Sequence, residues 1–197
     1  DYILGVLREY QLAQNKLEQE KTNQKNISSI KNLNLAYHPM YLGDSNSAKV
    51  IYEFVDYNCG YCQKFHQELI NVMNDNSLKL VIIQMPILGN FSEELTKLAL
   101  ASSLQGQFKV VHNYLYSTER KSKMEDILAD LFLRGVDLEI LKNDLDSQEV
   151  SDFLSIHRSY ADEFKFTGTP ATIIGNQIIP GFIDADKITE ILEKEFS

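Results

Sequence analysis

The pattern of apolar and polar residues is clearest between residues 50 and 73, where it predicts a strand followed by a helix. Residues 50–55 are β-branched, aromatic or apolar except for Glu53, which is typical of a buried strand. Farther on, apolar residues recur at helical spacing: Phe65, Leu69, Ile70 and Met73. Cys59 and Cys62 lie between the two patterns, so we expect the first cysteine at the start of the helix and the second one turn inside it.

Further strands are predicted on both sides of this unit. A short strand over residues 37–42 precedes it, and residues 78–85 form a second buried strand. The order strand, helix, strand predicts a parallel pair. Near the C-terminus, residues 171–179 predict a hairpin that turns at Gly175-Asn176. Asp184 then caps a last amphipathic helix.

The long stretch before the hairpin has helical periodicity and no convincing strand. Five helices are expected, over residues of about 92–104, 106–117, 123–133, 137–146 and 147–164. Together they form a helical insertion of about 92–164 in an α/β chain.

The N-terminal residues have a pattern of their own. Residues 1 to about 22 predict a helix with a heptad-like apolar seam, formed by Ile3, Leu7, Tyr10 and Leu17. The polar residues 22–34 are expected to be a linker. An apolar helix on a polar linker indicates self-association, and the alternative is a helix that folds back onto its own domain. We therefore separate residues 1–34, as a helix and linker, from a domain of residues 35–197.

Composition and charge exclude some classes of function. The chain has 197 residues, a net charge of −9 and no basic stripe, so binding to nucleic acid is not expected. No stretch approaches the roughly 18 apolar residues needed to cross a bilayer. The chain begins with Asp1 rather than Met, so we expect a processed or trimmed product from which any export signal is already gone.

The cysteine pair is the strongest chemical signal. At the start of a helix, unpaired backbone N–H groups and the positive end of the helix dipole favour the thiolate of Cys59. This favours dithiol redox chemistry over two alternatives, half of a zinc site and two buried structural cysteines. Zinc would need two more ligands, and the sequence has no second cysteine pair and no His-x3-5-His pair.

Three features together resemble the DsbA family of thioredoxin-fold thiol–disulfide oxidoreductases. They are Cys59-Gly60-Tyr61-Cys62 after a strand, the helical insertion, and Thr169-Pro170 before the hairpin. Supporting segments are residues 54–59, 86–89, 167–171 and 175–181. The resemblance covers about residues 35–197, and it implies a thioredoxin core of about 35–91 and 165–197 around the insertion.

Within this family the chain looks most like the suppressor-of-copper-sensitivity C type, which carries an N-terminal oligomerising segment. The resemblance therefore implies a homo-oligomer assembled through the N-terminal helix. It also implies export to the periplasm or an equivalent extracytoplasmic space.

The resemblance implies a role for each residue of the site. The thiolate of Cys59 would attack a substrate disulfide, and Cys62 would resolve the mixed disulfide that forms. Pro170 would be a cis-proline that faces the cysteine pair. Because proline has no N–H, it leaves the backbone of Thr169 free to pair with an extended substrate strand.

The residues between the cysteines are expected to tune the site. DsbA has Pro-His there, so Tyr61 removes one group that holds the thiolate, and we expect a less oxidising protein than DsbA. The pair Gly60-Tyr61 is the one found in the disulfide isomerase DsbC. Thr169 is likewise the choice of isomerase-type members, so the resemblance favours isomerisation.

Glu53 is the third catalytic candidate. It lies six residues before Cys59, and the same spacing holds a buried acid in thioredoxin and in DsbA. We expect a buried carboxyl group that passes protons to and from Cys62. The alternative is that Glu53 points to a solvated edge of the sheet.

Other polar and aromatic residues near the pair are given no role. His66, four positions after Cys62, is expected at the surface, and none of the four histidines is assigned chemistry. Tyr57 and Tyr61 are expected to be partly exposed beside the thiol of Cys59.

The expected function is thiol–disulfide exchange on unfolded or misfolded exported proteins, with isomerase or reductase character and without a cofactor or metal. A membrane redox partner would keep the dithiol reduced. The first alternative is a DsbA-like dithiol oxidase that serves a quinone-linked membrane partner. An alternative of another class is a copper-binding periplasmic protein, because thiolates are soft ligands that select Cu(I).

Overall fold

The structure, a computed structural model, describes residues 2–31, 40–75 and 77–197. The chain divides into two compact units, Asp1–Leu33 and Asn34–Ser197. None of the helices in the described ranges is long and apolar enough to span a bilayer.

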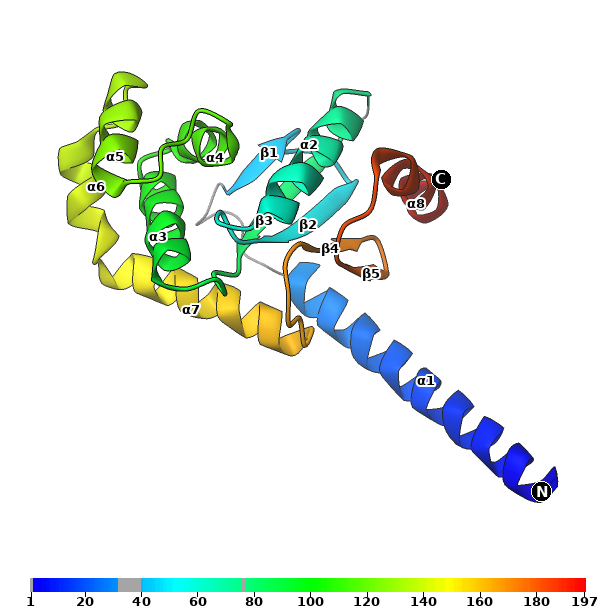
Figure 1. The fold of residues 1–197 in the computed structure, drawn as a ribbon. Coiled ribbons are helices and arrows are strands. Elements are labelled where there is room, and N and C mark those ends of the chain that lie inside the picture. The colour runs from blue at the N-terminus through cyan, green and yellow to red at the C-terminus, as the bar shows by residue number, and fades with distance from the viewer. Residues whose placement is uncertain (1, 32–39, 76) are drawn as a thin grey trace. The chain divides into compact units, whose positions relative to one another are not determined.

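The first unit consists of one helix, α1, which runs from Tyr2 to Lys31 (Figure 1). The prediction of a linker from Thr22 onward is wrong for residues 22–31, which continue the helix. Neither Gly nor Pro interrupts this segment, and Lys and Gln are good helix formers. The remaining residues of the predicted linker, 32–34, lie outside the described part of the chain.

The second unit is built on a five-stranded sheet of order β1-β3-β2-β4-β5 (Figure 1). Its strands are Tyr41–Gly43 (β1), Val50–Val55 (β2), Lys79–Gln84 (β3), Ala171–Ile174 (β4) and Gln177–Pro180 (β5). Strands β2 and β3 are parallel, and the other neighbours are antiparallel. This confirms the predicted parallel pair and hairpin. The first strand begins later than predicted, at Tyr41, and residues 37–39 are not among those described.

Seven helices are described in this unit. They are Gly60–Asp75 (α2), Asn90–Leu104 (α3), Phe108–Tyr116 (α4), Met124–Leu133 (α5), Leu138–Leu145 (α6), Gln148–Glu163 (α7) and Ala185–Phe196 (α8). Helices α3 to α7 are the predicted helical insertion. The carboxylate of Asp184 accepts a hydrogen bond from the backbone N–H of Lys187, so the predicted cap of α8 is present.

The alternation of side chains along β2 gives the sheet two different faces. Phe54 points to one face, where its ring packs edge-on against Phe164 and Phe166, just after α7. Glu53 points to the opposite face, where it meets His66 of α2. Helix α8 lies next to α2, since the N–H of Ala185 donates to the carboxylate of Glu68. The cysteine pair, at the start of α2, therefore lies beyond the carboxyl end of β2, the central strand of the sheet.

Candidate active site

The turn between β2 and α2 places Cys59 directly before the first residue of the helix, Gly60. The N–H of Cys59 donates to the carbonyl of Asp56 over 3.0 Å, and its carbonyl accepts from the N–H of Gln63 over 3.2 Å. Cys59 thus occupies the N-cap position, as predicted. The N–H groups of the first helical turn, which have no partner within the helix, are directed towards this end.

Asp56 holds this turn in place, and the sequence analysis missed it. Its buried carboxylate accepts from the N–H of Asn58 through one oxygen, at 2.8 Å. The other oxygen accepts from the N–H groups of Ile87 and Leu88, at 2.8 and 3.0 Å. One side chain therefore ties the cysteine turn to the loop after β3. The signal available in the sequence was an Asp two residues before Asn58 at the end of a strand, which is typical of an Asx-turn.

Thr169 and Pro170 lie against the exposed side of the pair. The peptide bond between them is cis. The Cys59 thiol donates to the carbonyl oxygen of Thr169 over 3.4 Å, although the two residues are 110 positions apart. The structure thus brings together the two motifs that the sequence analysis singled out separately.

The two cysteines differ in accessibility. Cys59 is partly exposed, whereas Cys62 has no exposed surface. Burial raises the pKa of the Cys62 thiol far above its usual value, an effect only partly offset by hydrogen bonds with Thr169 and Asp56. The inner cysteine is thus held as a thiol, and it needs a base before it can act as a nucleophile.

Glu53 is fully buried under the pair, which rules out the solvated edge. Its charge is among the causes that raise the pKa of the Cys62 thiol, so the two groups are close enough to interact. One carboxylate oxygen, Oε2, lies 3.2 Å from Nδ1 of His66. The other oxygen, Oε1, has no hydrogen-bond partner among the described residues.

The expectation that His66 lies at the surface is wrong. Its side chain is 3 % exposed, because the face of α2 that carries Cys62 also turns His66 towards β2 and α4. Its ring stacks on that of Tyr116, with centroids 4.9 Å apart. Histidine spacing alone did not reveal this, since the partners come from other elements.

The two tyrosines beside the pair behave differently. Tyr61 is 65 % exposed, as expected, and its ring lies 5.6 Å from Nζ of Lys64. Tyr57 is buried instead of partly exposed, because its hydroxyl turns inward to meet His112 and Gln84. Gly60 has free space where a Cβ atom would stand, so a side chain fits at this position.

A cluster of three or more His, Cys, Asp or Glu residues that could hold a metal ion does not occur in the described part of the chain. At the site itself, the ligands for a soft metal ion are the sulfur atoms of Cys59 and Cys62, and Cys62 is buried.

Comparisons with known proteins find relatives of most of this chain. The model of the thioredoxin family matches residues 35–194. Among curated proteins, the chain is 24% identical over 169 residues to the probable disulfide bond formation protein D of Bacillus cereus. That match covers 78% of this chain and 77% of the relative.

Two solved structures show the same fold. The thiol–disulfide exchange protein α-DsbA2 from Wolbachia pipientis has a TM-score of 0.79 at 24% identity, and the match covers 90% of this chain and 97% of that one. ScsC from Proteus mirabilis, in a transitional conformation, has a TM-score of 0.73 at 22% identity. That match covers 96% of this chain and 88% of the other, so it includes part of the N-terminal unit.

Proposed function

The chain belongs to the thioredoxin family and is a DsbA-like thiol–disulfide oxidoreductase, and from this premise we propose that it rearranges disulfides in exported, misfolded proteins. The observation that carries the proposal is the pairing of a partly exposed Cys59 with the Thr169 carbonyl, above a buried Cys62. Such a pair can attack a substrate disulfide and release the substrate again.

In the proposed mechanism the Cys59 thiolate attacks one sulfur of the substrate disulfide. A bond forms between Cys59 and that sulfur, and the second substrate sulfur leaves as a thiolate. The Cys62 thiol then loses its proton to Glu53 and attacks Cys59. This closes the Cys59–Cys62 disulfide and releases the first substrate sulfur with its electron pair. At this stage the enzyme dithiol is oxidised, and the substrate disulfide is reduced to two thiols. A different substrate thiolate then attacks Cys59 of the Cys59–Cys62 disulfide, and a second substrate thiolate displaces Cys59, so a new substrate disulfide forms and the dithiol is regenerated.

Thr169 and Pro170 are the proposed substrate-binding residues. The carbonyl of Thr169 already lies within contact distance of the Cys59 sulfur. An extended substrate strand that pairs with the backbone of Thr169 would therefore bring its disulfide to Cys59. Pro170 has no N–H to donate, so it leaves the thiolate available to the substrate.

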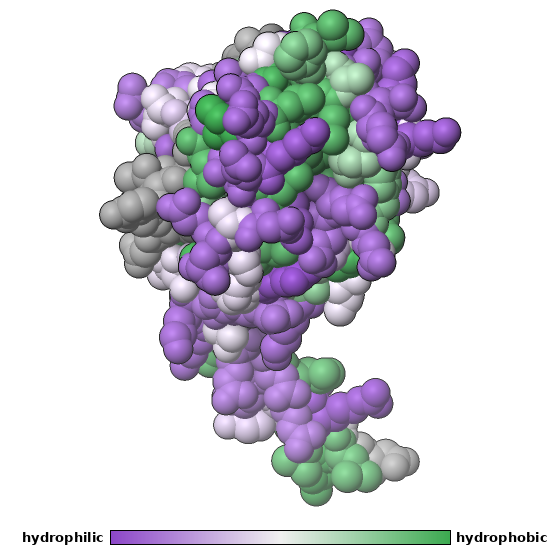
Figure 2. Space-filling view, turned by 90° about the vertical axis from the view of Figure 1, so that its left-hand side faces the viewer, coloured by the Kyte–Doolittle hydropathy of each residue, from purple (hydrophilic) through white to green (hydrophobic). Residues whose placement is uncertain are grey.

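Isomerisation is favoured over oxidation by the residues between the cysteines and by α1. Gly60-Tyr61 lacks the histidine of DsbA, which makes a weaker oxidant. In addition, α1 carries large apolar side chains that are about half to three-quarters exposed near its N-terminal end, namely Ile3, Leu4, Val6, Leu7, Tyr10 and Leu12 (Figure 2). We propose that they mediate self-association, which would place several sites around one substrate and raise their effective concentration.

Resemblance to the suppressor-of-copper-sensitivity C type supports an extracytoplasmic location and a membrane reductant. An isomerase dithiol must be kept reduced, so a reductase in the membrane is the proposed partner.

Refolding of scrambled ribonuclease tests the proposal. The reduced protein should restore ribonuclease activity, and Cys59→Ser should abolish this, because the nucleophile is lost. Cys62→Ser should instead accumulate mixed disulfides with the substrate, visible on non-reducing gels. Equal activity of Cys59→Ser and the wild type would contradict the assignment.

A second candidate, dithiol oxidation, is favoured by the curated relative, which carries the name of a disulfide bond formation protein. An oxidase would introduce disulfides into reduced ribonuclease quickly and rescue the scrambled form poorly. A strongly oxidising potential in glutathione buffers would favour this candidate.

A further inference from the structure

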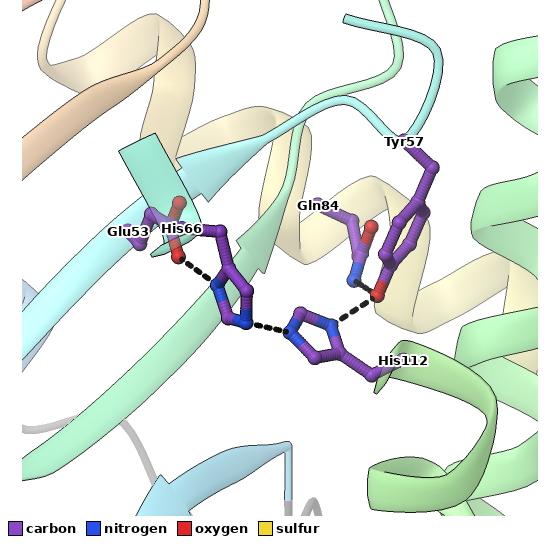
Figure 3. Close-up of polar contacts among 5 residues, drawn as sticks. All are labelled: Glu53, Tyr57, His66, Gln84 and His112. Carbon is purple, nitrogen blue, oxygen red and sulfur yellow. Dashed lines mark hydrogen bonds and ion pairs between the residues drawn. The ribbon is translucent and has the colours of Figure 1, made fainter. Parts of the chain in front are cut away.

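A continuous row of buried polar side chains leads from Glu53 to Gln84 (Figure 3). Nε2 of His66 lies 3.3 Å from Nε2 of His112, and Nδ1 of His112 lies 2.8 Å from the hydroxyl of Tyr57. The amide of Gln84 donates to that hydroxyl over 3.1 Å. The members come from different elements, and all are at most 3 % exposed. Buried polar groups must find hydrogen-bond partners, and apolar side chains could fill the same space, so a row of five such groups calls for an explanation.

The hydrogen bonds in this row have a consistent direction. The Gln84 carbonyl oxygen accepts from the Thr96 hydroxyl over 3.4 Å, so its amide nitrogen is free to donate to Tyr57. The Tyr57 hydroxyl then donates to Nδ1 of His112, and His112 carries its proton on Nε2.

The direction continues to the carboxylate. Nε2–H of His112 donates to Nε2 of His66, which must accept, and His66 therefore carries its proton on Nδ1. That proton is donated to Oε2 of Glu53. In the reverse direction the Tyr57 hydroxyl would accept from both neighbours, and its hydrogen would have no acceptor among the described contacts.

In this direction Nε2 of His66 is an acceptor and Nδ1–H is a donor. A second proton on Nε2 of His66 would face the Nε2–H of His112, and two donors cannot share one hydrogen bond. His112 does not relieve this by charging, because burial, and then His66, hold the pKa of His112 well below its usual value. A proton that reaches the pair must therefore go to Oε1 of Glu53, the oxygen without a described partner.

We propose that His66, held with its proton on Nδ1 by His112 and Tyr57, is a positioning residue of thiol–disulfide exchange. It keeps one oxygen of Glu53 occupied and stabilises the carboxylate, so that the other oxygen takes the proton of Cys62. The inference rests on the proposed function, since it concerns the step in which Cys62 attacks the mixed disulfide. That proton goes on to solvent when Glu53 is regenerated.

Several other titratable or polar groups surround Glu53. Helix α2 contributes Cys62, and α4 contributes Tyr116, whose pKa burial raises well above its usual value. The turn after β2 contributes Tyr57, whose pKa is raised by burial and also by the charge of Glu53. On β4, Thr172 is the cross-strand partner of Glu53, and its buried hydroxyl has no described partner either.

Nitrogen NMR of the histidine rings in the full-length protein tests the first half of the proposal. The neutral ring of His66 should carry its proton on Nδ1, and that of His112 on Nε2. A neutral His66 ring that carries its proton on Nε2 would overturn the proposal.

Step-resolved oxidation by glutathione disulfide tests the second half. Acid-quenched samples analysed by mass spectrometry separate formation of the Cys59–glutathione disulfide from its resolution by Cys62. In His66→Phe the first step should keep its rate. The second should slow by about tenfold throughout the pH range in which its rate rises with pH, because a charged hydrogen bond to the Glu53 carboxylate is lost. His66→Asn, whose amide nitrogen takes the position of Nδ1, should recover most of the rate.

His157→Phe is the matched control. His157 is equally buried, and its Nδ1 accepts from the backbone N–H of Gln84, outside the side-chain row. The inference is refuted if His157→Phe slows resolution by Cys62 as much as His66→Phe does. It is also refuted if the pH–rate profile of this step does not shift in His66→Phe, because His66 would then have a structural role only. If the mixed disulfide did not form even in the wild type, the proposed function itself would fail.

Discussion

Tyr61 projects from the first turn of α2 into solvent, next to the sulfur that is to be held as a thiolate. A histidine at this position would bring an N–H donor, and when protonated a positive charge, close to Cys59. Both favour the thiolate, and stabilisation of the reduced form makes a dithiol a stronger oxidant.

We therefore predict that Tyr61→His raises the reduction potential by about 30 mV or more, which corresponds to about 1.4 kcal/mol for this two-electron couple. Equilibration with glutathione buffers measures the shift. Tyr61→Phe, which removes only the hydroxyl, should stay near the wild-type value. A lower potential in Tyr61→His would contradict the account of the site.

His112 makes stability depend on pH, because burial keeps the pKa of its ring well below 6.5 in the folded protein. Below about pH 6.5 the unfolded chain binds a proton that the folded chain does not, so stability falls as pH falls. The loss should approach about 1.4 kcal/mol per pH unit from this group.

Urea unfolding of the wild type and His112→Gln between pH 7.5 and pH 5 checks this prediction. The variant lacks the buried imidazole of residue 112, so the wild type should lose more stability on acidification than the variant. Parallel pH dependences would mean that His112 charges freely in the fold.

At the level of elements, the carboxylate of Asp56 connects the end of β2 and the start of α2 to the loop after β3. Asp56→Ala would remove the acceptor of three partly buried N–H groups, in this turn and in the loop after β3, and we predict a loss of about 3 kcal/mol in the free energy of unfolding. Asp184→Ala, at the exposed cap of α8, should cost only about 1 kcal/mol. Urea unfolding compares the two, and equal losses would refute the central position of Asp56.

The elements themselves were predictable because their signals are local. The apolar run of β2, the helical spacing of α2 and the hairpin turn at Gly175-Asn176 depend on neighbouring residues. The contact between Cys59 and Thr169 is not local, and only resemblance to a family anticipated it. The positions of His66 and Tyr57 were misjudged for the same reason, since their partner His112 lies on a helix of the insertion.

The continuation of α1 to Lys31 is a different kind of error. Asn, Ser and Thr lower helix propensity only slightly, and a polar composition does not by itself end a helix that lacks Gly or Pro. The linker was predicted from polar composition alone, although the end of a helix is better predicted from a residue that terminates helices, such as Gly or Pro.

On the scale of the whole molecule, the exposed apolar side chains of α1 set the expected assembly. Deleting residues 1–31 should lower the mass measured by light scattering from that of an oligomer to that of a monomer. It should also reduce ribonuclease rescue while the oxidation rate per site stays constant. Leu7→Lys, within the exposed seam, should act in the same direction. A monomeric full-length protein would remove the proposal of self-association.

Because the two sulfur atoms differ in exposure, the reactivity of the cysteines of the reduced protein can report local unfolding at the start of α2. The chain has two cysteines, so a bulky alkylating reagent should tag the outer one quickly and leave the inner one untouched until the start of α2 detaches. The rate at which the inner cysteine is alkylated then measures how often the start of α2 unfolds locally. Mass spectrometry follows this reaction without any label on the protein.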